Sequence, residues 1–311
     1  MSVQTKATIA SFGGKLLRLS HNASSTNCEM AFNLYLPPQT TTNPLHKVPL
    51  LIYLAGLTCT GDNGAEKGFF QHAASEKGIA VLYPDTSPRG LKIEGEDESF
   101  DFGSGAGFYV DATKSPWNKG YKMYSYITSE LPKTVFENFK QVDSERVSIF
   151  GHSMGGHGAL TLFLKNPGKY KSVSAFAPIA NPSNCQWGQK AFGGYFGEEE
   201  KAKWAENDAT ELVKKWSGEP LDILIDVVCP SLPRLLHHER RKVFRLIKMV
   251  EQGTSDNFYK QGQLLPENFV KAAEGKGKVN VRLQDGYDHS YFTMATFADD
   301  HVGHAARYLL A

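Results

Sequence analysis

Ser153 lies in the pentapeptide G-H-S-M-G at residues 151–155, which matches the G-x-S-x-G pattern of a nucleophile elbow. In such an elbow, a serine hydroxyl at a sharp turn between a strand and a helix attacks a carbonyl carbon. Residues 146–150 (R-V-S-I-F) predict a short buried strand before the turn, and residues 156–164 (G-H-G-A-L-T-L-F-L) predict a helix after it. The pattern alone also occurs by chance in glycine-rich turns, but these two flanks favour a nucleophile.

A serine hydroxyl is a weak nucleophile without a base, and the base needs an acid that orients it. His289 lies directly after the last predicted strand and before the last predicted helix, where enzymes with this elbow carry the base. His152 and His157 are nearer in sequence, but a side chain within the elbow cannot fold back squarely onto the serine hydroxyl. We therefore predict that His289 is the base; a helix-capping or surface-loop histidine is the alternative.

The orienting acid should follow the strand that is predicted at residues 223–226. Asp256 is the first candidate, and Asp226 at the tip of the strand is the second. Asp285 and Asp288 are too close in sequence to the predicted base to be favoured. The alternative interpretation of Asp256 is an aspartate that caps a helix or stabilises a turn.

Acyl transfer also needs backbone N–H donors that bind the developing oxyanion. One donor should be the N–H of Met154, the residue after the nucleophile. The other should come from the loop after an early strand, here residues 55–58 (A-G-L-T), and we choose the N–H of Leu57. Gly56 has no side chain, which would let a substrate oxygen approach.

The elements that must hold these groups alternate between strands and helices, which predicts an α/β fold with a mostly parallel central sheet and helices on both faces. Residues 48–54 (V-P-L-L-I-Y-L) are typical of a strand covered on both faces, whereas 30–36 predict an antiparallel strand near an edge. Pro132 should kink the helix predicted at 121–139 or begin a second one. No repeat or linker divides the chain. Further strands are predicted at 79–83, 172–176, 223–226 and 279–283, and further helices at 65–77, 266–274 and 291–310.

The composition is that of an ordinary globular protein, with 41% hydrophobic and 22% charged residues among 311. The net charge of +1 does not indicate a nucleic-acid partner, and no stretch approaches about 18 apolar residues, so no membrane span is expected. The first residues lack the apolar segment of a signal peptide, which makes the cytoplasm the expected location. The cysteines form no C-x-x-C pair, which predicts free thiols in a reducing compartment. They are Cys28, Cys59, Cys185 and Cys229.

Four stretches together resemble the S-formylglutathione hydrolase family, also called esterase D. They are residues 54–60 (L-A-G-L-T-C-T), 101–113 (D-F-G-S-G-A-G-F-Y-V-D-A-T), 151–160 (G-H-S-M-G-G-H-G-A-L) and 287–292 (Y-D-H-S-Y-F). The resemblance extends over nearly the whole chain except one segment, and it implies a single α/β-hydrolase domain of residues 1–311. It also implies a triad of Ser153, Asp256 and His289.

The activity that this resemblance implies is a serine thioesterase that cleaves S-formylglutathione to glutathione and formate, in cytosolic formaldehyde detoxification. Side activity on small carboxylic esters and assembly as a homodimer are implied with it. The expected mechanism requires no metal and no cofactor. The resemblance also places Cys59 and Trp187 near the substrate pocket, where modification of the Cys59 thiol would block the acyl site. A small buried apolar residue is the alternative interpretation of Cys59, and core packing is that of Trp187.

Residues 227–251 depart from the family pattern, in which the strand ending at Asp226 runs directly into Gln252. These 25 residues hold six basic and two acidic side chains. We favour translated intron sequence as their origin over a tolerated surface insertion, which would cost little loop entropy. A basic amphipathic helix that binds membrane or nucleic acid is a third interpretation. The segment directly precedes the loop that carries Asp256. Of the catalytic candidates, Asp256 is therefore the one whose position the segment would affect most.

Two other functions fit the same residues. The protein could be another serine carboxylesterase of this fold, such as a carbohydrate deacetylase, and turnover of S-formylglutathione relative to an aryl ester would separate the two. Alternatively, the segment at 227–251 displaces the acid loop and leaves a catalytically impaired binding protein, whose Ser153 would not react with a fluorophosphonate. In each case the expected partner is a small molecule, with no nucleic acid and no membrane.

Overall fold

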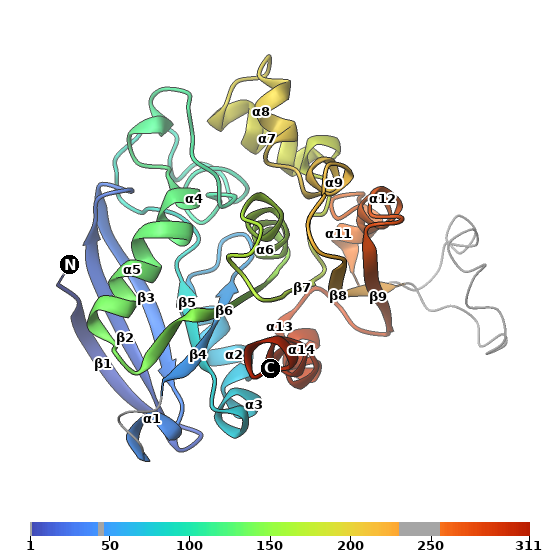
Figure 1. Cartoon of the computed structure of the whole chain (residues 1–311). Helices are drawn as coiled ribbons and strands as arrows, with labels where there is room; N and C mark the ends of the chain where they lie inside the picture. The colour runs from blue at the N-terminus through green and yellow to red at the C-terminus, as the bar shows by residue number, and fades with distance from the viewer. Residues whose placement is uncertain (1, 43–46, 230–255) are drawn as a thin grey trace, which may run out of the picture.

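A computed structural model describes residues 2–42, 47–229 and 256–311. One mixed sheet runs through this part of the chain, with the strand order β1-β2-β3-β5-β4-β6-β7-β8-β9 (Figure 1). Neighbouring strands from β5 through β4 to β9 pair in parallel, whereas the pairs among β1, β2, β3 and β5 are antiparallel. The strands are β1 Gln4–Ser11, β2 Gly14–Ala23, β3 Cys28–Leu36, β4 Val48–Leu54, β5 Ala80–Pro84, β6 Val142–His152, β7 Val173–Phe176, β8 Leu221–Cys229 and β9 Gly277–Asp285.

The hairpin of β1 and β2 changes the position of β3 in the sheet. β3 pairs antiparallel with β2 on one side and with β5 on the other, so the predicted antiparallel strand is confirmed, and it lies third from the edge of the sheet. Most residues of β1 are exposed, and its sequence therefore lacks the apolar alternation that indicates a strand. The two-residue turn holds Phe12 at φ 44° and Gly13 at φ 73°, the positive values that a tight hairpin turn needs.

In the structure, each long helix predicted from periodicity is divided into two or more shorter helical segments. Residues 65–77 contain parts of two helices, α2 and α3, which separate where Phe69 adopts a φ of 57°. Residues 121–139 hold α4, a π-helical turn at Tyr126–Glu130 and α5. Pro132 lies in the first turn of α5, as predicted for a proline that begins a second helix. Residues 291–310 hold α13 and α14.

The described helices are short. None of them combines the length and the apolar composition that crossing a membrane requires. The α-helices are α1 Gln39–Thr42, α2 Gly61–Lys67, α3 Phe70–Lys77, α4 Met123–Ser125, α5 Leu131–Asn138, α6 Met154–Lys165, α7 Gln186–Tyr195, α8 Lys201–Ala205, α9 Ala209–Lys214, α11 Asn257–Lys260, α12 Pro266–Ala272, α13 Tyr291–Thr296 and α14 Ala298–Leu309.

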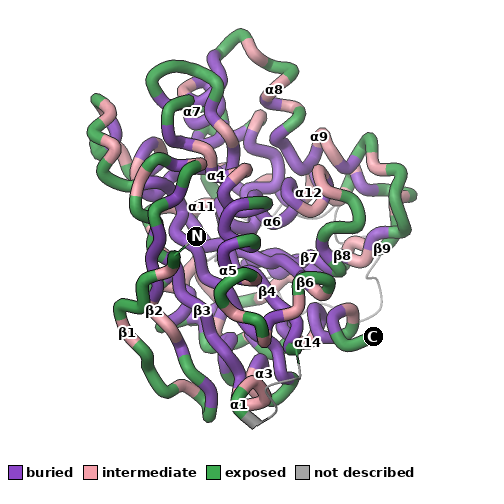
Figure 2. Tube along the Cα trace, turned by 60° about the vertical axis from the view of Figure 1, so that its left-hand side comes forward, coloured by how far each residue is buried: buried purple, intermediate pink, exposed green. Residues whose placement is uncertain are grey.

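β4 divides its side chains between two hydrophobic cores, one on each face of the sheet. Leu50, Ile52 and Leu54 join the core that includes residues of α5 and α6. Leu51 and Tyr53 join the core that includes residues of α3 and α14, and Figure 1 shows α3 and α14 side by side. Every residue of β4 is buried, as predicted, and Figure 2 shows burial concentrated in the central strands while β1 is largely exposed. Burying each leucine contributes about 2 kcal/mol to the stability of the fold. These buried strands therefore hold the loops at their carboxyl ends in place.

Candidate active site

Ser153 occupies the sharp turn between β6 and α6. Its backbone has φ 57° and ψ −118°, a combination that costs a non-glycine residue about 1–3 kcal/mol. The Ser153 N–H donates a hydrogen bond to the carbonyl of Phe176 in β7 at 2.9 Å. The Ser153 carbonyl accepts from the N–H groups of His157 at 3.0 Å and Ile179 at 3.1 Å. The strained turn is therefore fastened to α6, to β7 and to the loop after β7.

Two glycines allow the close approach of β6, α6 and β4 that forms this turn. A Cβ atom on Gly155 would overlap the carbonyl oxygens of Leu54 and Ala55, and a Cβ atom on Gly151 would overlap the backbone of Gly155. Backbone atoms of buried strands cannot move aside as a flexible side chain can. The small residues of the G-x-S-x-G pattern are therefore a steric requirement of the fold at this point.

We expect Gly155→Ala to lower the free energy of unfolding by about 3 kcal/mol or more, because the added methyl group must displace β4. Urea unfolding monitored by tryptophan fluorescence would measure this change. Gly303→Ala is the matched control, since a Cβ atom at this position in α14 meets no atom within 4 Å. It should stabilise the protein by up to about 1 kcal/mol. Equal stability of Gly155→Ala and the wild type would contradict the steric argument.

Asp256 and His289 meet although 32 residues separate them in the sequence. The Asp256 Oδ2 atom lies 2.8 Å from His289 Nδ1, and the Asp256 side chain is completely buried. The other carboxylate oxygen, Oδ1, accepts hydrogen bonds from the N–H groups of Phe258 and Tyr259 at 2.9 and 3.1 Å. Asp256 therefore caps α11 with one oxygen and contacts the imidazole with the other, so the two interpretations of this residue are compatible.

The His289 ring is packed against the nucleophile turn. Its centroid lies 4.5 Å from that of His152, the residue immediately before Ser153, and 4.9 Å from that of Phe258, whose ring is perpendicular to it. The Nε2 atom of His289 is buried and has no hydrogen-bond partner within the described residues. This is the ring nitrogen that remains available for a serine hydroxyl once Nδ1 contacts Asp256.

Two residues of this packing, His152 and Phe258, are not among the site residues predicted from sequence. Burial lowers the pKa of His152 well below its ordinary value, as does the nearby His289, so His152 stays neutral. A neutral ring can pack against an imidazole that becomes charged without repelling it. Phe258 lies two residues after Asp256, and this proximity is the only sequence signal that could have indicated it.

Asp226, the second candidate for the acid, has other partners. Its Oδ1 accepts hydrogen bonds from Arg282 Nε at 2.6 Å and Gln284 Nε2 at 3.1 Å, and its Oδ2 lies 3.1 Å from His301 Nε2. Burial acts to raise the pKa of Asp226, but the contacts with Arg282 and His301 outweigh it and lower the pKa to about 2. These interactions tie β8 to β9 and α14, and they occupy both carboxylate oxygens.

The loop after β4 is fastened by the glycine-rich stretch at residues 101–113. Tyr109 donates its hydroxyl to the Ala55 carbonyl at 2.8 Å, and the Thr58 N–H donates to the Gly105 carbonyl at 2.9 Å. A Cβ atom on Gly56 would lie 3.1 Å from the Cβ of Ser153, so this loop lies directly against the nucleophile turn.

The predicted oxyanion donors, Leu57 and Met154, lie on the two sides of this junction, in the loop after β4 and at the first residue of α6. No backbone carbonyl of the described residues accepts a hydrogen bond from either N–H group. Tyr109, which contacts this loop, is not among the site residues predicted from sequence, although it lies in one of the four stretches that resemble the family.

Cys59 and Trp187 each lie next to an aromatic side chain of the segments that follow β8 and β9. The Cys59 Sγ atom is 4.0 Å from the Tyr291 hydroxyl, and burial raises the pKa of the thiol. Trp187 is 7% exposed and packs edge-to-face on Phe258 with ring centroids 4.8 Å apart. The Phe258 ring also contacts His289, so it connects the two residues. No group of three or more His, Cys, Asp or Glu side chains in the described ranges could hold a metal ion.

Comparisons with known proteins identify the family. A family model described as "Putative esterase" matches residues 23–303. The chain is 52% identical to the S-formylglutathione hydrolase of Mus musculus over 96% of both chains, and 48% identical to that of Arabidopsis thaliana over 96% of this chain and 95% of the relative. The chain belongs to the S-formylglutathione hydrolase family.

The solved structure of an S-formylglutathione hydrolase from Agrobacterium tumefaciens matches this fold with a TM-score of 0.84 at 40% identity, over 99% of this chain and all of that one. Membership of the S-formylglutathione hydrolase family confirms the predicted α/β-hydrolase fold and the classification of the protein as a hydrolase.

Part of the segment that departs from the family pattern belongs to the sheet. Val227 and Val228 are 1% exposed and continue β8, where they pair with Leu283 and Gln284 of β9. The strand ends at Cys229. Residues 230–251 lie outside the described part of the chain, so the origin of the segment remains a prediction.

Proposed function

We propose that this protein hydrolyses S-formylglutathione to glutathione and formate, with Ser153 as nucleophile, His289 as base and Asp256 as orienting acid. The observation that carries the chemistry is the 2.8 Å contact between buried Asp256 and His289, whose ring packs against the nucleophile turn. The likeness to S-formylglutathione hydrolases over nearly the full chain supports the substrate. The same contact weighs against a binding protein with a displaced acid.

The first half of the reaction is the acylation of Ser153. It begins when Ser153 Oγ attacks the formyl carbon and the hydroxyl proton passes to His289 Nε2. The carbonyl electron pair moves onto oxygen, and the N–H groups of Leu57 and Met154 bind this oxyanion. Each donor lowers the barrier by about 3 kcal/mol. Asp256 keeps the proton of the imidazole on Nδ1 and stabilises the positive charge that the ring acquires.

The tetrahedral intermediate then collapses and breaks the carbon–sulfur bond. Glutathione leaves with the proton from His289, and a formyl ester remains on Ser153. His289 next takes a proton from water, whose oxygen attacks the ester carbon through a second oxyanion. Collapse of this intermediate returns the proton to Ser153 Oγ and releases formic acid, which ionises to formate.

Relative turnover of three substrates tests the assignment: S-formylglutathione, an aryl acetate and an acetylated oligosaccharide. We expect kcat/KM for S-formylglutathione to exceed the other two by about 100-fold or more. Preference for the acetylated sugar would favour a carbohydrate deacetylase, and preference for the aryl ester would favour a general carboxylesterase. Failure of a fluorophosphonate to label Ser153 in folded protein would overturn the serine mechanism itself.

The finer assignments rest on the family resemblance. We propose a cytoplasmic homodimer with side activity on small carboxylic esters, in which Cys59 and Trp187 border the pocket. Because burial raises the pKa of Cys59, its thiol should react slowly with alkylating reagents near neutral pH. Complete labelling of Cys59 without loss of activity would contradict its place in the acyl pocket.

We also propose that the segment at 227–251 is translated intron sequence within one α/β-hydrolase domain. Peptide mass spectrometry of the protein isolated from its native source should find a peptide in which Asp226 is joined directly to Gln252. The matched control is recombinant protein expressed from the full sequence, which must yield peptides from within 230–251. The same internal peptides in the native protein would show that the segment is a genuine insertion.

A further inference from the structure

The loop after β4 contains a tight turn that carries Leu57, one of the two proposed oxyanion donors. The Cys59 N–H donates to the Gly56 carbonyl at 3.3 Å, so Leu57 and Thr58 are the central residues of this turn. Thr58 has a φ of 68°, a value that glycine or asparagine ordinarily supplies at the third position of a turn. A β-branched residue adopts this conformation only where its surroundings impose it.

Cys59 closes the turn, and both polar groups of its backbone are bound. Its N–H contacts the turn itself, through Gly56. Its carbonyl oxygen accepts hydrogen bonds from the Thr86 hydroxyl at 2.5 Å and from Arg89 Nη2 at 3.1 Å. Thr86 and Arg89 both follow β5, the neighbour of β4 in the sheet. The end of the turn is therefore held from outside by two side chains of an adjacent loop.

The carboxylate of Asp85 orders these two donors. Its Oδ2 accepts from Arg89 Nε at 2.9 Å, and its Oδ1 accepts from Arg89 Nη2 at 3.0 Å. This two-point contact fixes the plane of the guanidinium group. Asp85 Oδ1 also accepts from the backbone N–H of Thr86 at 2.7 Å. The Asp85 side chain is only 8% exposed, so water competes little for these contacts.

The segment after β5 also holds the glycine-rich stretch that lies against the turn. Ser87 Oγ accepts from the Gly105 N–H at 2.8 Å, and the Thr86 carbonyl accepts from the Gly107 N–H at 3.2 Å. The Gly105 carbonyl in turn accepts from the Thr58 N–H. Thr86 and Ser87 are completely buried. Both the strained residue of the turn and the residue that closes it are therefore connected to residues 85–89.

We propose that Thr86 and Arg89 are positioning residues for the oxyanion hole. By holding the Cys59 carbonyl, they keep the strained turn in the form from which the Leu57 N–H binds the oxyanion. The inference rests on the proposed function, because an oxyanion hole is needed only where Ser153 attacks a carbonyl carbon. Both side chains donate to the loop rather than to Ser153, so they act on the reaction through the turn.

Thr86→Val tests the proposal, because valine has nearly the shape of threonine and lacks the hydroxyl donor. We expect kcat for S-formylglutathione to fall about 30-fold with KM within about twofold, since loss of a complete oxyanion donor costs about 100-fold or more and a misplaced donor costs less. Thr86→Ser keeps the hydroxyl and should retain kcat within about threefold of the wild type. Arg89→Met removes the other donor, at a side chain that is 38% exposed, and should lower kcat about tenfold.

A transition-state analogue distinguishes a positioning role from a general loss of structure. A trifluoromethyl ketone adds reversibly to a serine hydroxyl, and the oxygen of the adduct stands in for the oxyanion. Its inhibition constant should rise in Thr86→Val by about the factor by which kcat falls.

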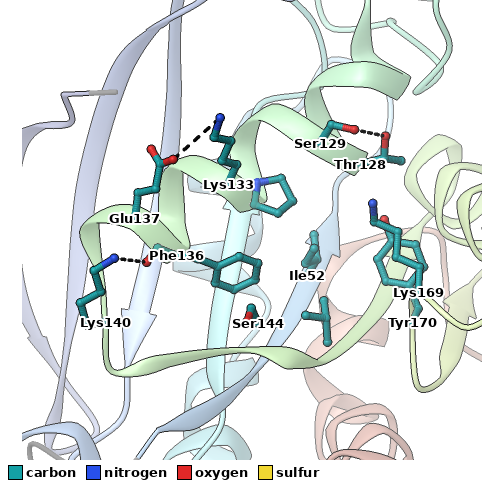
Figure 3. Close-up of a pocket in the computed structure, with 12 residues that line it drawn as sticks. Ile52, Thr128, Ser129, Lys133, Phe136, Glu137, Lys140, Ser144, Lys169 and Tyr170 are labelled. Carbon is teal, nitrogen blue, oxygen red and sulfur yellow. Dashed lines mark hydrogen bonds and ion pairs between the residues drawn. The ribbon is translucent and has the colours of Figure 1, made fainter.

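Thr128→Val is the matched control for the lost hydroxyl. Thr128 is also buried, and its hydroxyl also donates to a backbone carbonyl, that of Tyr124, at 2.8 Å. It lies beside a groove that none of Ser153, Asp256 and His289 lines (Figure 3). Thr128→Val should therefore leave both kcat and the inhibition constant unchanged.

The outcomes separate this inference from the function on which it rests. Unchanged kcat in both Thr86→Val and Arg89→Met, with an active wild type, would refute the positioning role alone. Equal losses in Thr86→Val and Thr86→Ser would refute it as well, because the hydroxyl would then not be what holds the loop. If the wild type fails to hydrolyse S-formylglutathione, the proposed substrate is refuted, and the same variants compared with an aryl acetate still decide the role of the turn.

Discussion

Ser153→Ala is expected to lower kcat for S-formylglutathione by about five orders of magnitude while the protein remains folded. The substitution removes the oxygen that forms the acyl bond, and the oxyanion donors and substrate contacts leave only residual catalysis. Alanine can occupy the turn because the space around the Cβ atom is unchanged. Single-turnover kinetics with S-formylglutathione would measure the loss, and urea unfolding would establish that the fold is retained.

Ser174→Ala provides a demanding control for this prediction. Ser174 Oγ lies 2.9 Å from His301 Nδ1, and His301 Nε2 lies 3.1 Å from Asp226, so the chain holds a second serine–histidine–aspartate array. Ser174 is 2% exposed and His301 is completely buried, which denies a substrate access to them. Ser174→Ala should therefore lower stability and leave kcat nearly unchanged. Equal loss of activity in the two alanine variants would contradict the assignment of the nucleophile.

The second large expected effect on kcat concerns Asp256, the proposed orienting acid. Asp256→Asn should lower kcat by about four orders of magnitude, because an amide cannot stabilise the imidazolium of His289 and can hold the neutral ring in the wrong tautomer. The stability should change little, since asparagine caps a helix about as well as aspartate and α11 retains its cap. Steady-state kinetics and urea unfolding, measured on the same preparation, would separate the two effects.

Asp226→Asn is the matched comparison, and it should lower the stability of the protein rather than kcat. Loss of the buried charge beside Arg282 and His301 should lower the free energy of unfolding by about 3 kcal/mol, with kcat within about threefold of the wild type. A large loss of kcat in folded Asp226→Asn, with full activity in Asp256→Asn, would transfer the role of the acid to Asp226.

The pH dependence of stability provides a further check on Asp226. Its folded pKa of about 2 lies below the ordinary value of 3.8, so the carboxylate stabilises the fold above about pH 4 and this contribution disappears as the pH falls toward 2. The shift corresponds to about 2 kcal/mol. The difference in stability between the wild type and Asp226→Asn should therefore shrink between about pH 5 and about pH 3. A constant difference over this interval would contradict the assigned ion pair.

Much of the candidate site could be predicted from sequence because its signals are local. The G-x-S-x-G pattern and its flanks specify a strand, a turn and a helix within about twenty residues, and Gly155 is required there by contacts that any such turn must make. The place of His289 followed from its position after the last strand. Asp256 could only be ranked above Asp226, because nothing local to either residue indicates its partners.

The tertiary structure decides what depends on residues far apart in the chain. The partners of Asp226 come from β9 and α14, and the two rings that pack against His289 come from β6 and α11, so none of these contacts has a local pattern. The hairpin of β1 and β2 outside β3 was missed for the same reason, since exposed β1 carries no apolar signal and only its pairing with β2 places it at the edge of the sheet. Periodicity specifies which face of a segment is buried, whereas the choice of neighbour comes from the global packing of the sheet.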